Sequence, residues 1–351
     1  MERTHIYRVR DQEIAVYAPR QLLHAQRQAG PRQAVFQDDP LQGDGGTPSV
    51  ALLGIKAGDL DELQLTPDLW KTQTGGDDFY QRNTKVYAVE WVEFHFLWNC
   101  SLPMFRDKRV RQALALAFDH DELIQKLRQG IDQPSRGMFN SDSQWAPPNF
   151  AATFQKRDLD KAEQLLEAAG WVDHDGDGIR DQEIDGKTVK FEFTVKTSNR
   201  PDRVAICNLL KENLEQIGIE VNVRPLEFTV LTDDMLHHRF QAAFGGWGTG
   251  TDPDTTDNIF GTNQDRNYGL YSNPAVDELY KVGRREFDPA KRLEVYRQIH
   301  TQIYDDQPYM WLYYQNAYYA FNKQLRGYVF SPRGPFHYGP GFSSIWRTAQ
   351  E

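Results

Sequence analysis

Apolar positions recur with helical spacing through the middle of the chain. Behind Asp107, for example, Val110, Leu114 and Ala117 fall on one stripe, and the aspartate is a suitable N-cap. Several further helices begin at an aspartate or end near a glycine or proline, as helices commonly do. The predicted helices are residues 107–118, 119–130, 158–170, 203–218, 228–240, 271–287 and 288–308.

Alternation of apolar and polar positions marks the strands. Phe191 and Phe193, for example, face one way in an alternating run rich in β-branched and aromatic residues. A single predicted helix lies between the predicted strands at residues 188–195 and 219–224, so these two strands are predicted to be parallel with a right-handed connection. The predicted strands are residues 85–99, 188–195, 219–224, 241–247 and 309–321.

Strands that alternate with helices predict an α/β fold. The 351 residues exceed what one hydrophobic core usually serves, so we expect two lobes. A net charge of −10 and the absence of a basic stripe argue against a nucleic-acid partner. No apolar run approaches the roughly 20 residues that span a bilayer.

The N-terminal residues carry charges throughout and have no apolar run typical of a secretory leader. Read literally, this predicts a cytoplasmic protein; the alternative is that the chain begins within a longer precursor. Residues 28–50, rich in Gly, Pro, Gln and Asp, predict a loop or linker. Cys100 and Cys207 have no metal-binding spacing and form either a disulfide or two buried thiols.

Residues 245–260 have neither helical nor strand period, and they begin a predicted loop that extends to residue 271. Trp247 ends a predicted strand, and ligands in open α/β sheets bind just outside the carboxyl ends of strands. The indole either plugs a core beneath an ordinary loop or forms a stacking surface at a cleft. In the second case aromatic walls, polar handles and hinge glycines surround a small ligand: Trp247, Tyr268, Tyr271, Asp252, Asp254, Asn267, Gly245, Gly246, Gly248 and Gly250.

One acidic loop has the opening pattern of a calcium site. Asp173, Asp175 and Asp177 alternate and Gly178 follows, but the twelfth position, where a bidentate Glu is required, is Ile184. The alternative is a solvated turn between a helix and a strand. We expect no bound metal and no cofactor.

The chemistry-bearing motifs of common enzymes are missing from the sequence. It has no nucleophile elbow, phosphate-binding glycine loop or dinucleotide fingerprint, which favours a binding protein over an enzyme. A soluble carbohydrate-active hydrolase that uses a carboxylate pair remains the alternative. A ligand-sensing domain of a regulator is a third possibility.

From about Leu53 onward the chain resembles the family 5 extracellular solute-binding proteins, the dipeptide and oligopeptide receptors of ABC importers. The resemblance lies in five stretches that occur in the family's order: residues 57–63, 105–124, 161–181, 245–255 and 267–314. It implies a type II periplasmic-binding-protein clamshell that closes on a ligand and catalyses nothing.

The resemblance also implies a domain plan. Residues 1–95 would be the second part of a partial first lobe, residues 96–325 a complete ligand-binding lobe, and residues 326–351 the return to the first lobe. We therefore expect a fragment or mis-started frame of an exported receptor, located in the periplasm or otherwise outside the cytoplasm. The implied partners are a small solute, in particular a peptide, and ABC permease subunits in the membrane; we expect a monomer.

Two departures from the family pattern concern ligand choice. Peptide receptors of this family commonly carry an aspartate for the α-ammonium group three residues after the loop tryptophan, where this chain has Gly250. An arginine that reads the carboxylate, three residues before the tryptophan, is Phe244 here. Asp252 is a candidate replacement for the first, and Arg239 or Arg266 for the second. The ligand is then a peptide read through its backbone, or a metal chelate, an opine or an oligosaccharide.

Overall fold

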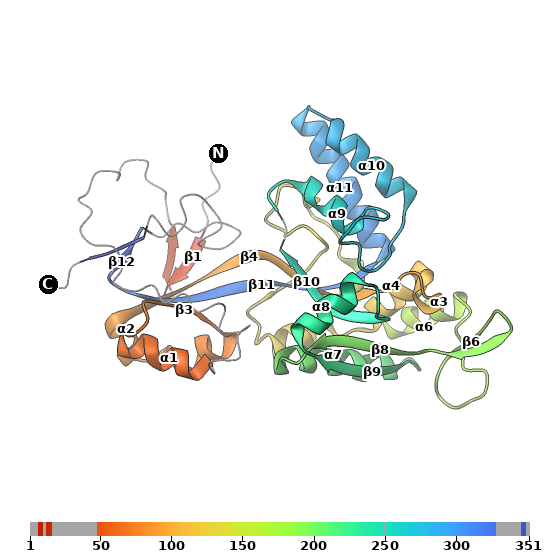
Figure 1. The fold of residues 1–351 in the computed structure, drawn as a ribbon, viewed down its shortest axis with the longest axis horizontal. Coiled ribbons are helices and arrows are strands. Elements are labelled where there is room, and N and C mark those ends of the chain that lie inside the picture. Colours follow the sequence, from red (N-terminus) through yellow and green to blue (C-terminus); the bar gives the residue numbers. More distant parts are fainter. Residues whose placement is uncertain (1–5, 10–11, 16–47, 249, 328–344, 349–351) are drawn as a thin grey trace. The chain divides into compact units, whose positions relative to one another are not determined.

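The computed structural model describes residues 6–9, 12–15, 48–248, 250–327 and 345–348 (Figure 1). The chain divides into two compact units. Unit 1 consists of residues 1–90 and 315–351, and unit 2 of residues 91–314. Among the described residues, no helix combines the length and apolar character that crossing a bilayer requires.

The sheet of unit 2 is built around β10. Its strand order is β4-β10-β8-β9, with β10 parallel to β8 and β8 parallel to β9, whereas β4 runs antiparallel to β10. Helix α7 (Pro201–Glu215) connects β8 to β9, and α8 (Phe228–Leu236) connects β9 to β10. The predicted parallel pair is confirmed. The strands are β4 (Asn83–Trp98), β8 (Glu192–Ser198), β9 (Glu220–Leu226) and β10 (Ala242–Gly248).

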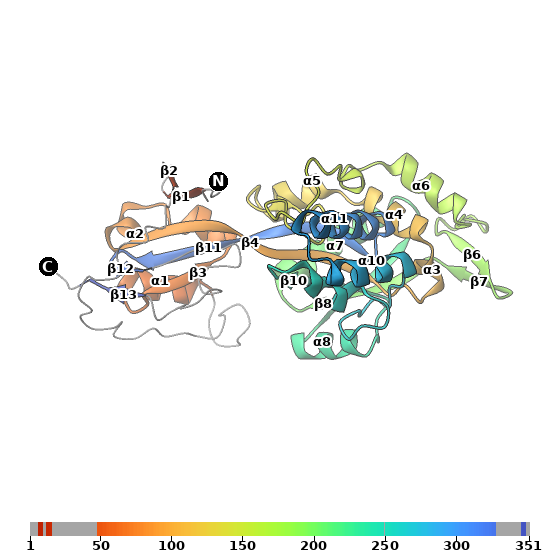
Figure 2. The same cartoon turned by 90° about the horizontal axis from the view of Figure 1, so that it is seen from above.

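Two hydrophobic cores lie on the two faces of the β4–β10 pair. Phe96 and Trp98 belong to the first core, together with the inner faces of α4, α6 and α7. Leu97 and Ala243, one residue out of phase, belong to the second core, which is filled from α10 and α11. Successive strand residues point to opposite faces, so this alternation assigns each side chain to one core. Figure 2 shows α10 and α11 side by side, in agreement with their extensive contacts.

Side-chain caps fix several helix starts where the sequence predicts them. Asp107, Asp158 and Asp288 each accept a hydrogen bond from a backbone N–H of the first turn. Besides α7 and α8, the helices of unit 2 are α3 (Pro103–Arg106), α4 (Lys108–Ala117), α5 (His120–Glu122), the π-helix Leu123–Leu127, α6 (Leu159–Ala168), α9 (Asp257–Phe260), α10 (Pro274–Arg285), α11 (Pro289–Asp306) and the 3₁₀ turns Thr153–Gln155 and Pro253–Thr256.

Two predicted elements are interrupted in the structure, whereas most others differ from the prediction only at their ends. The helix expected at residues 119–130 is one α-turn followed by a π-turn that ends at Leu127. The strand expected at residues 188–195 is broken at Phe191, whose N–H donates to the Arg180 carbonyl. Residues before the break form β7 (Lys187–Lys190), which pairs with β6 (Asp181–Ile184) in a separate hairpin.

Unit 1 contains the hairpin of β1 (Ile6–Val9) and β2 (Gln12–Ala15) and a strand pair from distant parts of the chain. There, β3 (Glu62–Leu65) pairs with the second half of β11 (Tyr309–Asn322). Its other elements are α1 (Pro48–Ala57), the π-helix Leu69–Gln73, α2 (Asp77–Arg82), β12 (Leu325–Arg326) and β13 (Trp346–Arg347). Most of the predicted linker at residues 28–50 and of the predicted return at residues 326–351 lies outside the described residues.

Arg111 is a buried cation that ties α4 to the end of α11. Its guanidinium donates to four carbonyl oxygens, at 2.6–3.2 Å: those of Phe105, Arg106, Asp306 and Gln307. Arg111 is 5% exposed. It therefore satisfies carbonyls at the end of α11, where Gln307 adopts a left-handed conformation with φ 45°.

Arg111→Ala is expected to lower the free energy of unfolding by about 3 kcal/mol, because several buried carbonyls lose their donor. Urea titration followed by circular dichroism measures this change. Arg106→Ala removes an exposed arginine of the neighbouring helix and serves as the control, with a loss of less than about 0.5 kcal/mol. Equal losses in the two variants would contradict the assigned role.

Two buried histidines are held uncharged. Nε2 of His120 lies 3.1 Å from the Trp311 carbonyl oxygen, and Nε2 of His300 lies 2.9 Å from that of Arg136. A carbonyl only accepts, so each Nε2 carries the proton and donates. Burial lowers the pKa of each imidazole to about 4, although the backbone hydrogen bonds act in the opposite direction.

The free energy of unfolding is expected to fall as the pH decreases from about 6.5 towards 4. In that window the unfolded histidines bind protons that the folded ones do not, so acid favours unfolding. At pH 5 each histidine contributes a loss of about 2 kcal/mol relative to pH 7. His300→Gln should reduce the difference between urea titrations at the two pH values by about that amount; an unchanged difference would contradict the prediction.

Candidate functional site

Trp247 lies at the carboxyl end of β10 and is half-buried against the second core. Its indole Nε1–H donates to the Tyr309 hydroxyl at 3.2 Å. The Tyr268 ring lies 5.5 Å away between ring centres, and the Arg266 guanidinium carbon lies 5.7 Å from the indole centre. The ring is therefore held in one orientation but not enclosed. This geometry combines the two alternatives left open by the sequence: one side packs on the core, and part of the ring stays accessible.

The glycines around Trp247 belong to the strand and are not hinges, which corrects the expectation for Gly245, Gly246 and Gly248. A Cβ on Gly246 would come within 2.6 Å of the Phe94 ring, and one on Gly245 within 3.3 Å of His95 Nε2. Their role is to admit the large side chains of β4 close to the backbone of β10.

The two predicted acidic handles are engaged in ion pairs with the last two helices of unit 2. Asp252 pairs with Arg292 at 2.9 Å, and Asp254 pairs with Arg284 at 3.0 Å and accepts from the Tyr296 hydroxyl at 2.9 Å. Partial burial is the largest single effect on the pKa of Asp252 and acts to raise it, but the hydrogen bond from Arg292, the backbone N–H of Asp254 and the charge of Arg292 together hold the pKa below the usual range. These contacts fasten the loop to α10 and α11.

Asn267 and Tyr271 are buried and serve the loop itself. The Asn267 amide donates to the carbonyls of Gly261 and Tyr271 at 3.0 and 2.7 Å and accepts from the Tyr271 N–H at 3.0 Å. The Tyr271 hydroxyl donates to Asp306 at 2.6 Å. Both amide hydrogens of Asn267 are thus used within the loop. The contacts favour a structural role for both residues over the predicted ligand contacts.

The two predicted arginines lie in different surroundings. Arg239 pairs with Asp233 and, at 3.1 Å, with Asp234 after the end of α8. Arg266 is exposed, faces the indole of Trp247, and makes no ion pair within the described part of the chain. The structure therefore brings Trp247, Tyr268 and Arg266 together but leaves Arg239 in a separate surface cluster.

Arg203 was not identified from the sequence. It lies in the first turn of α7, directly after the carboxyl end of β8. Its guanidinium carbon is 4.0 Å from the centre of the Phe94 ring and 5.1 Å from that of Phe244, the residue at the position of the family arginine. It also donates to the Tyr313 hydroxyl at 3.2 Å. An arginine in the first turn of a helix that follows a parallel strand is the signal that could have indicated it.

Arg203 belongs to a cluster of arginines and aspartates. Its nearest carboxylate is Asp202, at 3.5 Å, but the same carboxylate also pairs with Arg200 at 3.1 Å and with Arg128 at 3.9 Å. Asp132 pairs with Arg128 at 2.6 Å, so three arginines and two aspartates of the described residues meet here.

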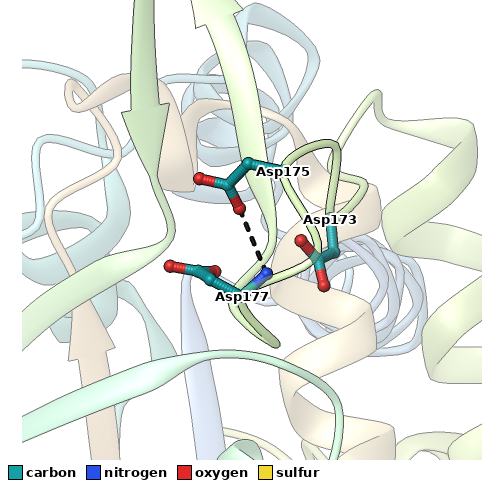
Figure 3. Close-up of side chains that lie close together, drawn as sticks. All are labelled: Asp173, Asp175 and Asp177. Carbon is teal, nitrogen blue, oxygen red and sulfur yellow. Dashed lines mark hydrogen bonds between the residues drawn. The ribbon is translucent and has the colours of Figure 1, made fainter.

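The acidic loop before β6 is already paired with the side chain of a lysine. Carboxylate oxygens of Asp173, Asp175 and Asp177 lie within 4.8 Å of one another (Figure 3). Each of the three accepts at least one backbone N–H of the loop. The Lys190 ammonium from β7 pairs with Asp177 and, at 3.3 Å, with Asp175. Together with Ile184 at the twelfth position, these contacts favour a turn closed by lysine over a calcium site.

Both cysteines are free thiols. Burial raises the pKa of Cys207 to about 12, and burial also raises the pKa of Cys100. The sequence allowed either a disulfide or two separate thiols, and the structure has the two separate thiols. Neither thiol ionises near neutral pH, so neither is an activated nucleophile.

A family model described as bacterial extracellular solute-binding proteins, family 5, matches residues 46–268. Among curated proteins, the oligopeptide-binding protein AppA of Bacillus subtilis is 33% identical over 294 residues, which cover 81% of this chain and 52% of AppA. The chain spans about half the length of the curated relatives that it matches.

Solved structures give the same result for the fold. The structure of AppA from Bacillus subtilis in complex with a nonapeptide has a TM-score of 0.76 at 30% identity, covering 86% of this chain and 59% of that one. The oligopeptide-binding protein of Thermus thermophilus, complexed with a pentapeptide, has a TM-score of 0.72 at 22% identity, covering 88% and 58%. The predicted α/β fold of the solute-binding type is confirmed.

Proposed function

We propose that this chain, which belongs to the bacterial extracellular solute-binding proteins of family 5, is the peptide-capturing part of an ABC importer and acts outside the cytoplasm. Its partners are then a peptide and the membrane permease to which the complex is delivered. The family consists of substrate-binding proteins and not of enzymes, and its relatives do not favour the alternative of a hydrolase.

The observation that carries the proposal is the half-buried Trp247 at the carboxyl end of β10. A fixed aromatic ring binds flat or apolar groups without losing much side-chain entropy, because its orientation is set before the ligand arrives. Tyr268 and Arg266 extend this surface. Peptide side chains and peptide planes both suit such a wall.

The carboxylate of a peptide requires a cation, which Phe244 does not supply. We assign this role to Arg203, because its guanidinium lies over the Phe244 ring and bidentate hydrogen bonding to carboxylates is a property of arginine. Arg266 is the second candidate. Asp252 is already paired with Arg292, so it is a poor reader of the α-ammonium group. A peptide held through its backbone and its carboxyl end fits this set of residues best.

Trp247→Ala is expected to weaken the binding of synthetic nonapeptides by roughly thirtyfold, equivalent to about 2 kcal/mol. The unfolding midpoint should change little, because the ring is only half-buried. Isothermal titration calorimetry and urea titration measure the two quantities. Phe287→Ala, at a residue that is 94% exposed, is the matched control and should change neither.

Two results would contradict this prediction. If Trp247→Ala unfolds unit 2 as the loss of a core tryptophan would, the indole is part of the core and not of a site. If the wild-type chain binds no peptide of two to nine residues, the proposed function itself fails.

Arg203→Gln is expected to weaken peptides with a free carboxyl end about tenfold, since hydrogen bonds to charged groups contribute about 1.5 kcal/mol or more. Peptides with an amidated carboxyl end should bind both proteins equally. Arg266→Gln is compared in the same titrations and should change the affinities for peptides with free and amidated carboxyl ends equally. If Arg266→Gln alone abolishes the preference for the free carboxyl end, Arg266 is the reader and the assignment of Arg203 is wrong.

A further inference from the structure

A buried acid and a buried histidine lie behind the Trp247 wall. Glu93 and His95 stand two residues apart on β4, so both point to the face of the second core. The Nδ1 atom of His95 lies 2.9 and 3.0 Å from the two carboxylate oxygens of Glu93. The residues are 2% and 1% exposed. The two contacts between Nδ1 and the carboxyl group of Glu93 fix the plane of the imidazole.

The fixed imidazole supports the partner of Trp247. The rings of His95 and Tyr309 are stacked, with centres 3.9 Å apart and planes 8° apart. The Tyr309 hydroxyl accepts the indole N–H of Trp247. In the ladder of β4 with β10, Glu93 is the register partner of Trp247 and His95 that of Gly245. Gly245 leaves room for the imidazole, because a Cβ there would come within 3.3 Å of Nε2.

We propose that Glu93 and His95 are positioning residues for ligand binding: the carboxylate orients the imidazole, the imidazole holds the Tyr309 ring, and the Tyr309 hydroxyl sets the angle of the Trp247 indole. The cost of burying an acid is otherwise unexplained, because apolar side chains would fill the same core more cheaply. The inference rests on the proposed function only in its last step, from the indole to the ligand.

The first test needs no ligand. The indole N–H signals of the eight tryptophans are recorded by ¹H–¹⁵N NMR, and the signal of Trp247 is assigned by its loss in Trp247→Phe. His95→Ala should displace this signal while those of Trp98 and Trp171, in the first core, stay in place. His300→Ala removes a histidine of equal burial from another part of unit 2 and should leave the Trp247 signal unchanged.

Glu93→Gln keeps an acceptor for His95 but removes the charge, and it should displace the Trp247 signal in the same direction by a smaller amount. If His95→Ala does not fold, the Trp247 signal in Glu93→Gln alone tests the proposal. The proposal is overturned if both variants leave the signal in place, or if His300→Ala displaces it equally.

The second test uses the nonapeptides. His95→Ala should weaken peptide binding about tenfold in the wild-type background but cause no further loss in a protein that already carries Trp247→Ala. The losses of binding free energy are not additive because His95 acts on the ligand only through Trp247. Additive losses would overturn the proposed linkage. If Trp247→Ala itself leaves affinity unchanged, the proposed function fails, whereas the NMR result still decides whether Glu93 and His95 position the indole.

Discussion

The antiparallel pairing of β4 with β10 is the constraint on which unit 2 depends. The two strands share a register from Ala242↔Trp98 to Gly248↔Val92. A shift by one residue would send every side chain of β4 to the opposite core. Phe94 and Phe96 would then enter the core that now holds Leu97, and the buried pair of Glu93 and His95 would face the first core. Gly246 helps to fix the register, because only a residue without Cβ fits beneath the Phe94 ring.

The same pairing explains why the candidate site has two parts. Odd-numbered residues of β10 face the second core, and Trp247 is the last of them that the core covers in part. Even-numbered residues face the first core, where the guanidinium of Arg203 lies over the rings of Phe244 and Phe94. An aromatic surface and a cation are thus held by opposite faces of one strand pair near the carboxyl end of β10. A rigid ladder positions both more accurately than a loop could.

Those features that depend on neighbouring residues could be predicted from the sequence. The caps at Asp107 and Asp158, the parallel strands around α7 and the position of Trp247 at a strand end all follow from local patterns. The break at Phe191 could not be predicted, because it is set by a hydrogen bond to Arg180 and by pairing of the preceding residues in a hairpin. Asn267 was predicted as a ligand contact because the sequence carries no signal for the hydrogen bonds that its amide makes within the loop. Arg203 and Lys190 were missed for a related reason, since their roles come from partners on other strands and loops.

Most of the charge in the candidate loop is committed before any ligand arrives. Asp252 and Asp254 form ion pairs with arginines of α11 and α10. The two carboxylates are therefore already neutralised, and the loop is less acidic towards a ligand than its sequence suggests. If an existing ion pair must be broken before an ammonium group can bind, its loss offsets much of the free energy that the new ion pair contributes. If the proposed function holds, selectivity depends more on cations that lie against aromatic rings. Arg203 shares the carboxylate of Asp202 with two other arginines, and Arg266 lies beside Trp247, so both are placed to offer hydrogen-bond donors to the carboxylate or carbonyl groups of the proposed peptide ligand.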